Sequence, residues 1–165
     1  MTHVRGFTLL ELLVVVIILG ILAALAMPQL SEVAGQAGVT TLMDPLRAVR
    51  GQCLLYYEQH ADTPPGYPNG DTTQAPTEEA FRQQMLFSSD ANGQVNPDGS
   101  LPLGPYMERI PANPMNQLAT VQVLADDANI PAADNSHGYV FQPATLIFKA
   151  DVPGEDTYGC DYSSY

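Results

Sequence analysis

Residues 6–11 read Gly6-Phe7-Thr8-Leu9-Leu10-Glu11, and an apolar run follows them as far as Met27, immediately before Pro28. The stretch 7–27 has 21 residues and a single charged side chain, that of Glu11. As a helix it would be about 31 Å long, at about 1.5 Å per residue, which matches the hydrocarbon core of a bilayer. Each Leu, Ile or Val favours membrane insertion by about 0.3–0.6 kcal/mol, against a cost of roughly 3 kcal/mol for one central acid. The run therefore predicts a membrane-inserted helix.

The charges on either side of this run predict its orientation. Arg5 is the one fixed positive charge before it, and short basic flanks tend to stay in the cytoplasm. The whole chain has 18 acidic and 6 basic side chains, a net charge of -12, and most of the acids follow residue 57. We therefore expect the acidic remainder outside the cytoplasm. Its charge would repel the phosphates of nucleic acids, so the composition argues against a nucleic-acid partner.

Two ordinary interpretations of this beginning are open. One is a secretory signal peptide cut after Ala24-Leu25-Ala26, and the other is a plain membrane anchor in which Glu11 is incidental. Against the first, the apolar run is longer than the usual 7 to 15 residues and has a carboxylate near its start. Simple export requires no such carboxylate.

The stretch Gly6 to Glu11, the apolar run and Pro28 together resemble the class III signal of type IV pilins and type II secretion pseudopilins. In that family a prepilin peptidase cuts after the glycine and methylates the new N-terminal phenylalanine, which here are Gly6 and Phe7. The family has a glutamate fifth in the mature chain, here Glu11, and a carboxylate in hydrocarbon needs a partner. The resemblance implies that this partner is the Phe7 amine of a neighbouring subunit. It also implies that Pro28 loosens the helix during assembly, although an ordinary proline kink is an equal alternative.

The resemblance implies an α+β, type IV pilin-like fold, in which a long hydrophobic helix packs on a small C-terminal antiparallel sheet. We expect a leader at 1–6, a transmembrane and assembly helix at 7–27, an amphipathic continuation at 28–60 and a globular head at 61–165. Apolar residues at helical spacing form the stripe that would face the head: Leu30, Val33, Ala37, Leu42, Leu46, Val49, Cys53 and Tyr57. Asp44-Pro45 resembles a helix start, so we predict a kink or a new start there, besides a kink at Pro28.

Beyond Ala61, prolines and glycines predict a loop over residues 64–70. A short helix over 77–86 is expected, with Thr77 as its N-cap. Residues 88–105 are predicted to form turns. A strand is expected over 120–124, and a hairpin over 138–142 and 145–150, around Pro143.

Three further stretches resemble the major pseudopilin class: residues 54–57 with Tyr67-Pro68, residues 104–107 with 110–114, and residues 138–141. The chain departs from that class at Asn113-Pro114, where the class usually has Asp-Pro-Trp-Gly, and it has no tryptophan. The likeness implies a structural, non-enzymatic subunit that is cleaved, N-methylated and polymerised into the pseudopilus of a type II secretion system.

The implied partners are further copies of the chain, other pilin-like subunits, the prepilin peptidase/methyltransferase and the inner-membrane assembly machinery. The implied location is the bacterial inner membrane, spanned once, with the C-terminal domain in the periplasm. A subunit of a type IV pilus is the nearest alternative. A membrane-anchored periplasmic binding or enzymatic domain is an alternative of another class, although the chain has none of the common nucleophile, metalloprotease or phosphate-binding motifs.

Cys53 and Cys160 lie 107 positions apart and fit no CxxC motif, so they are either a disulfide or two unpaired thiols. No cofactor is expected, apart from calcium, which the pseudopilin class often holds near its C-terminus. Side chains that could supply oxygen ligands there are Asp151, Glu155, Asp156 and Asp161. A weaker candidate is the alternating run from Asp90 to Asp98, for which solvated turns are the simpler interpretation. His3, His60 and His137 are too scattered for a metal site and are expected at the surface.

Overall fold

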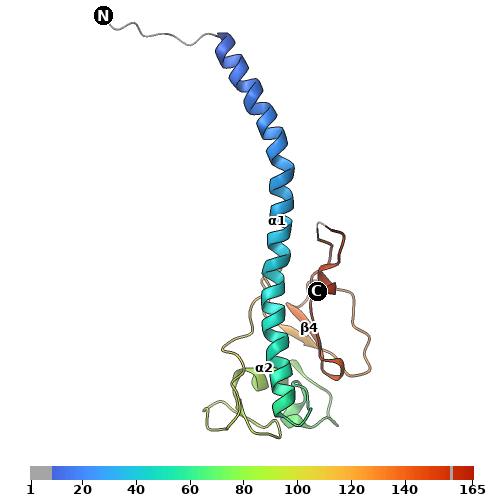
Figure 1. The fold of residues 1–165 in the computed structure, drawn as a ribbon. Coiled ribbons are helices and arrows are strands. Elements are labelled where there is room, and N and C mark those ends of the chain that lie inside the picture. The colour runs from blue at the N-terminus through green and yellow to red at the C-terminus, as the bar shows by residue number, and fades with distance from the viewer. Residues whose placement is uncertain (1–8, 157) are drawn as a thin grey trace, which may run out of the picture. The chain divides into compact units, whose positions relative to one another are not determined.

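The computed structural model describes residues 9–156 and 158–165, and over 25–37 it describes the backbone alone. The chain divides into two compact units, Met1–Ala37 and Gly38–Tyr165. The helix α1, Leu9–Gln59, includes residues of both units (Figure 1). From here on we call the second unit, Gly38–Tyr165, the head, which begins earlier in the chain than the head predicted at 61–165. The head contains the last part of α1 and all the other elements.

Helix α1 runs without interruption through both Pro28 and Pro45. The prediction of a new helix start near residue 44 is therefore wrong, and Asp44 lies inside the helix rather than at its N-cap. Proline removes one backbone hydrogen bond from a helix interior. Leu42 and Leu46, on either side of Pro45, are fully buried in the head, and their packing favours an unbroken helix. The kinks at the two prolines stay predictions.

The last part of α1 has the predicted amphipathic stripe from Leu42 onward, whereas Leu30, Val33 and Ala37 lie outside the residues whose side chains the structure describes. Its buried side chains are Leu42, Leu46, Val49, Cys53 and Tyr56, and buried His60 follows directly after the last residue of the helix. Steps of three and four residues keep these side chains on one helix face. Tyr56, fully buried, takes the place predicted for Tyr57, which is half-buried.

After α1 the chain forms the 3-10 turn η1, Pro68–Gly70, and the helix α2, Glu78–Leu86. Thr77 caps α2 as predicted, because its side-chain oxygen accepts a hydrogen bond from the Ala80 amide at 3.1 Å. Glu78 and Glu79 lie in the first turn, where the helix dipole favours acids. Phe81 and Met85 of α2 are fully buried.

Two small sheets complete the head. Strands β1, Ser88–Ser89, and β2, Val95–Asn96, pair antiparallel in a region where the sequence predicts only turns. The predicted hairpin is confirmed: β4, Tyr139–Gln142, and β5, Ile147–Ala150, pair antiparallel around the turn η2, Pro143–Thr145. Strand β3, Val121–Val123, adds to β4 in parallel, so this sheet is mixed where a wholly antiparallel one is predicted. The turn η3, Tyr162–Ser164, follows.

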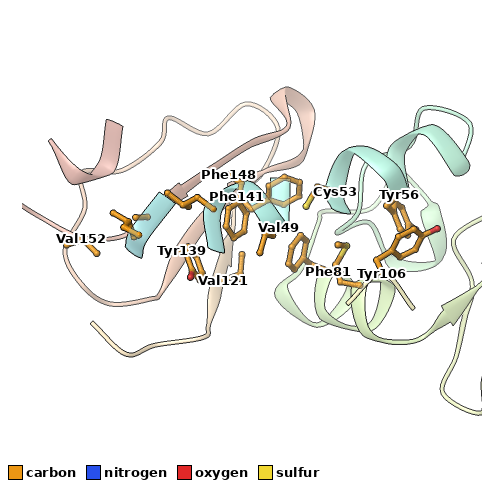
Figure 2. Close-up of a cluster of buried hydrophobic side chains, with 14 residues drawn as sticks. Val49, Cys53, Tyr56, Phe81, Tyr106, Val121, Tyr139, Phe141, Phe148 and Val152 are labelled. Atoms are coloured by element: carbon orange, nitrogen blue, oxygen red, sulfur yellow. The ribbon is translucent and has the colours of Figure 1, made fainter. Parts of the chain in front are cut away.

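The core of the head lies between α1, α2 and the mixed sheet. Figure 2 shows Val49 and Cys53 of α1 facing Phe141 and Phe148, with Phe81 beside them. The ring centroids of Phe81 and Phe141 are 5.0 Å apart. Such aromatic contacts stabilise the fold by about 0.5–1.5 kcal/mol per pair, beyond the free energy gained from burying their apolar area. The α+β class that the sequence predicts is therefore confirmed.

Candidate assembly surface

The first part of α1 presents apolar side chains on every side. Over residues 9–24 each side chain is exposed, and Leu9 retains 84% of its accessible surface. The large apolar residues exposed here are Leu9, Leu10, Leu12, Leu13, Val14, Val15, Val16, Ile17, Ile18, Leu19, Ile21 and Leu22. A helix that is apolar all round is normally buried in a membrane or in a larger assembly. This surface, residues 9–24, is the candidate assembly surface.

Glu11 lies in the first turn of α1, within the candidate assembly surface. A carboxylate is favoured there by the partial positive charge of the helix N-terminus. Gly6 and Phe7 lie outside the described residues, as does the side chain of Pro28. Within the part of the chain that the structure describes, no helix combines the length and the apolarity needed to cross a membrane.

The two cysteines are not bridged. Cys53 is buried in the core on α1, whereas Cys160 is exposed on the segment after β5. Of the two alternatives that the sequence leaves open, the structure therefore has two unpaired thiols, because the core surrounds one thiol while the other faces solvent. Burial raises the pKa of the Cys53 thiol to about 12, which makes it a poor nucleophile.

The four candidate calcium ligands do not converge. Asp151 is 2% exposed, and its carboxylate accepts hydrogen bonds from the amides of Asp134 and His137, each at 2.8 Å. The carboxylate of Asp156 accepts from other backbone amides, and Glu155 and Asp161 are exposed. Among residues 9–156 and 158–165, no three His, Cys, Asp or Glu side chains form a group that could hold a metal ion.

The run from Asp90 to Asp98 forms local turns. The Asp90 carboxylate accepts from the amides of Asn92 and Gln94, at 2.9 and 3.0 Å. The Asp98 carboxylate likewise accepts from the Ser100 amide at 2.8 Å. Side chains of this type commonly close such turns.

His60 is 2% exposed, contrary to the predicted surface position. Its Nδ1 lies 2.7 Å from the Tyr56 carbonyl oxygen, and its Nε2 lies 3.0 Å from Ser89 Oγ. It follows directly after the last residue of α1, four positions after buried Tyr56, and Ser89, which is distant in the sequence, supplies a polar partner for the buried ring. His137 is half-buried, and His3 lies outside the described residues.

Several polar residues that hold the head together were not recognised in the sequence. Gln84 is 1% exposed, and its Oε1 accepts a hydrogen bond from the Gly66 amide at 2.7 Å. Its Nε2 donates to the carbonyl oxygens of Tyr67 and Gly93, at 2.8 and 3.3 Å. Arg50 of α1 donates to the Phe148 carbonyl oxygen from Nε at 2.9 Å and from Nη2 at 2.7 Å. No local motif signals such contacts, because their partners lie far away in the sequence.

Comparison with known proteins identifies the family of this chain. Residues 1–27 match the family described as the prokaryotic N-terminal methylation motif. The type II secretion system core protein G of Klebsiella pneumoniae is 31% identical over 114 residues, which cover 69% of this chain and 71% of that protein. The chain belongs to the type II secretion system core protein G family.

Two further relatives match shorter parts of this core protein G family member. The core protein G of Pseudomonas aeruginosa is 47% identical over 51 residues, 31% of this chain and 36% of that protein. The type IV major pilin protein PilE1 of Neisseria gonorrhoeae is 34% identical over 91 residues, 55% of this chain and 42% of that protein. No solved structure matches the chain significantly.

Proposed function

We propose that this chain is the precursor of a pseudopilin that polymerises into the pseudopilus of a type II secretion system. The observation that carries the proposal is the methylation motif over residues 1–27, within which the candidate assembly surface, residues 9–24, is apolar all round. A helix of this kind is suited to a membrane before assembly and to contact with other subunits afterwards. The single-pass location in the inner membrane, with the head in the periplasm, belongs to this proposal.

In the proposed pathway, prepilin peptidase cuts between Gly6 and Phe7 and methylates the new Phe7 amine. Inner-membrane machinery then adds the subunit to the filament. The Glu11 carboxylate of one subunit meets the Phe7 amine of the next, so the charge pair sets the axial offset between neighbouring helices. An unpaired charge in a low-dielectric bundle costs several kcal/mol, which makes the correct offset strongly preferred.

A structural role also agrees with the surface of the head. A cavity beside α1, lined by Val49, Tyr106 and Arg109 among others, has a volume of about 270 Å³. The cavities beside α2 and β5 have volumes of about 180 and 140 Å³. Small-molecule sites usually have volumes of about 300–1,000 Å³. We therefore propose a subunit that performs no catalysis and acts by assembling.

A type IV pilus subunit is the second candidate, and the likeness to the gonococcal major pilin favours it. Neighbouring genes distinguish the two. A secretion ATPase and an outer-membrane secretin beside several pseudopilin genes would support the secretion role. Retraction ATPases and fibres on the cell surface would support the pilus.

Overproduction of the subunit with its secretion machinery tests assembly. Glu11→Ala should be inserted and processed but should fail to form filaments, and Glu11→Gln should also be defective because it keeps the shape and loses the charge. Glu58→Ala is the matched control, since Glu58 is exposed on the head part of α1. Wild-type filament yield from Glu11→Ala would refute the pairing.

A further inference from the structure

The segment after β5 folds back on itself as a closed loop. Residues Glu155 and Asp161 form an antiparallel bridge, and the Tyr162 amide donates to the Gly154 carbonyl oxygen at 3.0 Å. Between them, the Asp156 amide donates to the Cys160 carbonyl oxygen at 2.9 Å. Backbone hydrogen bonds thus join the ends of the loop.

The Asp156 carboxylate organises the interior of this loop. Its Oδ1 accepts from the Tyr158 amide at 2.7 Å and from the Cys160 amide at 2.9 Å. Its Oδ2 accepts from the Tyr165 hydroxyl. These bonds lower the pKa of Asp156, the Tyr165 bond having the largest effect, and the same bond raises the pKa of Tyr165 to about 12. The whole Asp156 residue is 8% exposed.

The loop is also tied to the core helix. Arg50 of α1 donates to the backbone carbonyl oxygen of Tyr165, as well as to that of Phe148 in β5. Tyr165 therefore receives a hydrogen bond from α1 and gives one to Asp156. We call these three residues, Arg50, Asp156 and Tyr165, the tail clasp.

In the pseudopilin class the comparable region often holds calcium, whose six to eight oxygen ligands must point at one centre. Here the groups that face these carboxylates are hydrogen-bond donors, which do not suit a cation. N–H and O–H groups present positive hydrogen atoms to both Asp156 oxygens, and Asp151 is engaged with the Asp134 and His137 amides. Because a cation and these donors would compete for the same lone pairs, calcium binding would require the clasp to open.

We propose that the tail clasp replaces calcium in this chain, so that the C-terminal loop folds on hydrogen bonds alone and the head needs no divalent cation. Asp156 is the positioning residue, because its carboxylate accepts hydrogen bonds from Tyr158, Cys160 and Tyr165. The inference concerns the folded head and does not depend on whether subunits polymerise.

Hydrogen exchange on the full-length protein in detergent tests the proposal, read on the peptide that covers residues 154–165. It is measured in EGTA and in about 10 mM calcium chloride, roughly tenfold above the Kd of the weakest extracellular calcium modules. We expect equal protection of this peptide, which contains the Cys160 amide, in both. Asp156→Asn should speed its exchange about tenfold or more, as expected for a lost charge-assisted bond, and Tyr165→Phe should speed it less.

The double variant Glu155→Gln, Asp161→Asn is the matched control. It removes the two exposed carboxylates that a calcium ion would recruit and leaves the clasp intact, so protection should stay at the wild-type level. Calcium-dependent protection of the wild type, lost in the double variant, would overturn the proposal. Unchanged exchange in both Asp156→Asn and Tyr165→Phe would overturn it as well, whereas failure to form filaments would bear only on the proposed function.

Discussion

The ring of His60 stacks on the ring of Tyr56, with their centroids 3.6 Å apart and their planes 9° apart. The Tyr56 carbonyl can only accept a hydrogen bond, so Nδ1 carries the proton and Nε2 accepts from the Ser89 hydroxyl in the neutral form. This arrangement joins the end of α1 to β1. Burial lowers the pKa of His60, and the hydrogen bond to the Tyr56 carbonyl and the nearby Asp90 oppose this effect only in part.

Acidification should therefore destabilise the head. Below the unfolded pKa of about 6.5 the unfolded chain takes up a proton that folded His60 resists, so stability falls as the pH drops. We expect a loss between about pH 7.5 and pH 5.5, at most about 1.4 kcal/mol per pH unit for one proton. Denaturant unfolding of the full-length protein in detergent measures it. His60→Gln should flatten the dependence and His137→Gln should keep it; equal slopes in wild type and His60→Gln would disprove this role.

Gly138→Ala should destabilise the head strongly. A Cβ at residue 138 would lie 2.2 Å from the Leu118 carbonyl oxygen and 2.8 Å from the Leu118 carbonyl carbon, so backbone must move. Overpacking of this kind typically costs about 1–3 kcal/mol. Gly51→Ala is the control, because its Cβ would meet nothing within 4 Å on α1 and alanine favours helix by roughly 0.5–1 kcal/mol. Thermal unfolding should move in opposite directions for the two variants.

Gln84→Leu should also destabilise, although it places an apolar side chain of similar size in the core. It would leave the Gly66 amide and the Tyr67 carbonyl buried without their partner, at about 1–3 kcal/mol each. Gln83→Leu, one position earlier, removes only a hydrogen bond to exposed Glu79 and should change the free energy of unfolding by less than about 0.5 kcal/mol. Equal effects at both positions would contradict the bracing role of Gln84.

These residues show how far the sequence could predict the structure. The head stripe of α1, the Thr77 cap and the β4–β5 hairpin follow from local spacing and turn residues, and all three are confirmed. The parallel pairing of β3 was not predictable locally, because Val121 meets Tyr139 across a long connection. Buried His60 and Gln84 were missed for the same reason: a polar residue is stable inside only where remote segments supply its partners.

The match of residues 1–27 to the N-terminal methylation motif was predictable from Gly6, Phe7 and Glu11, because such a motif is specified by short local sequence. Cleavage after Gly6 stays a prediction. The absence of a Cys53–Cys160 bridge was not predictable, since spacing alone cannot show that one thiol enters the core and the other faces solvent.

Thiol labelling checks the state of the cysteines. In the folded protein, without reductant, maleimide should label Cys160 alone, because Cys53 is 2% exposed and its pKa is raised to about 12. Cys53 should react only after denaturation. If neither thiol reacts in denaturant until a reductant is added, the two are bridged and the structural assignment is wrong.

The most direct test of the pseudopilin assignment is the mass of the mature N-terminus. Protein purified from membranes of cells that contain the prepilin peptidase should begin at Phe7 and carry one methyl group on its amine. Deletion of the peptidase should leave residues 1–6 attached and the amine of Phe7 unavailable. A mature chain that begins at Met27 would instead establish an ordinary signal peptide, remove the candidate assembly surface from the mature protein and contradict the account.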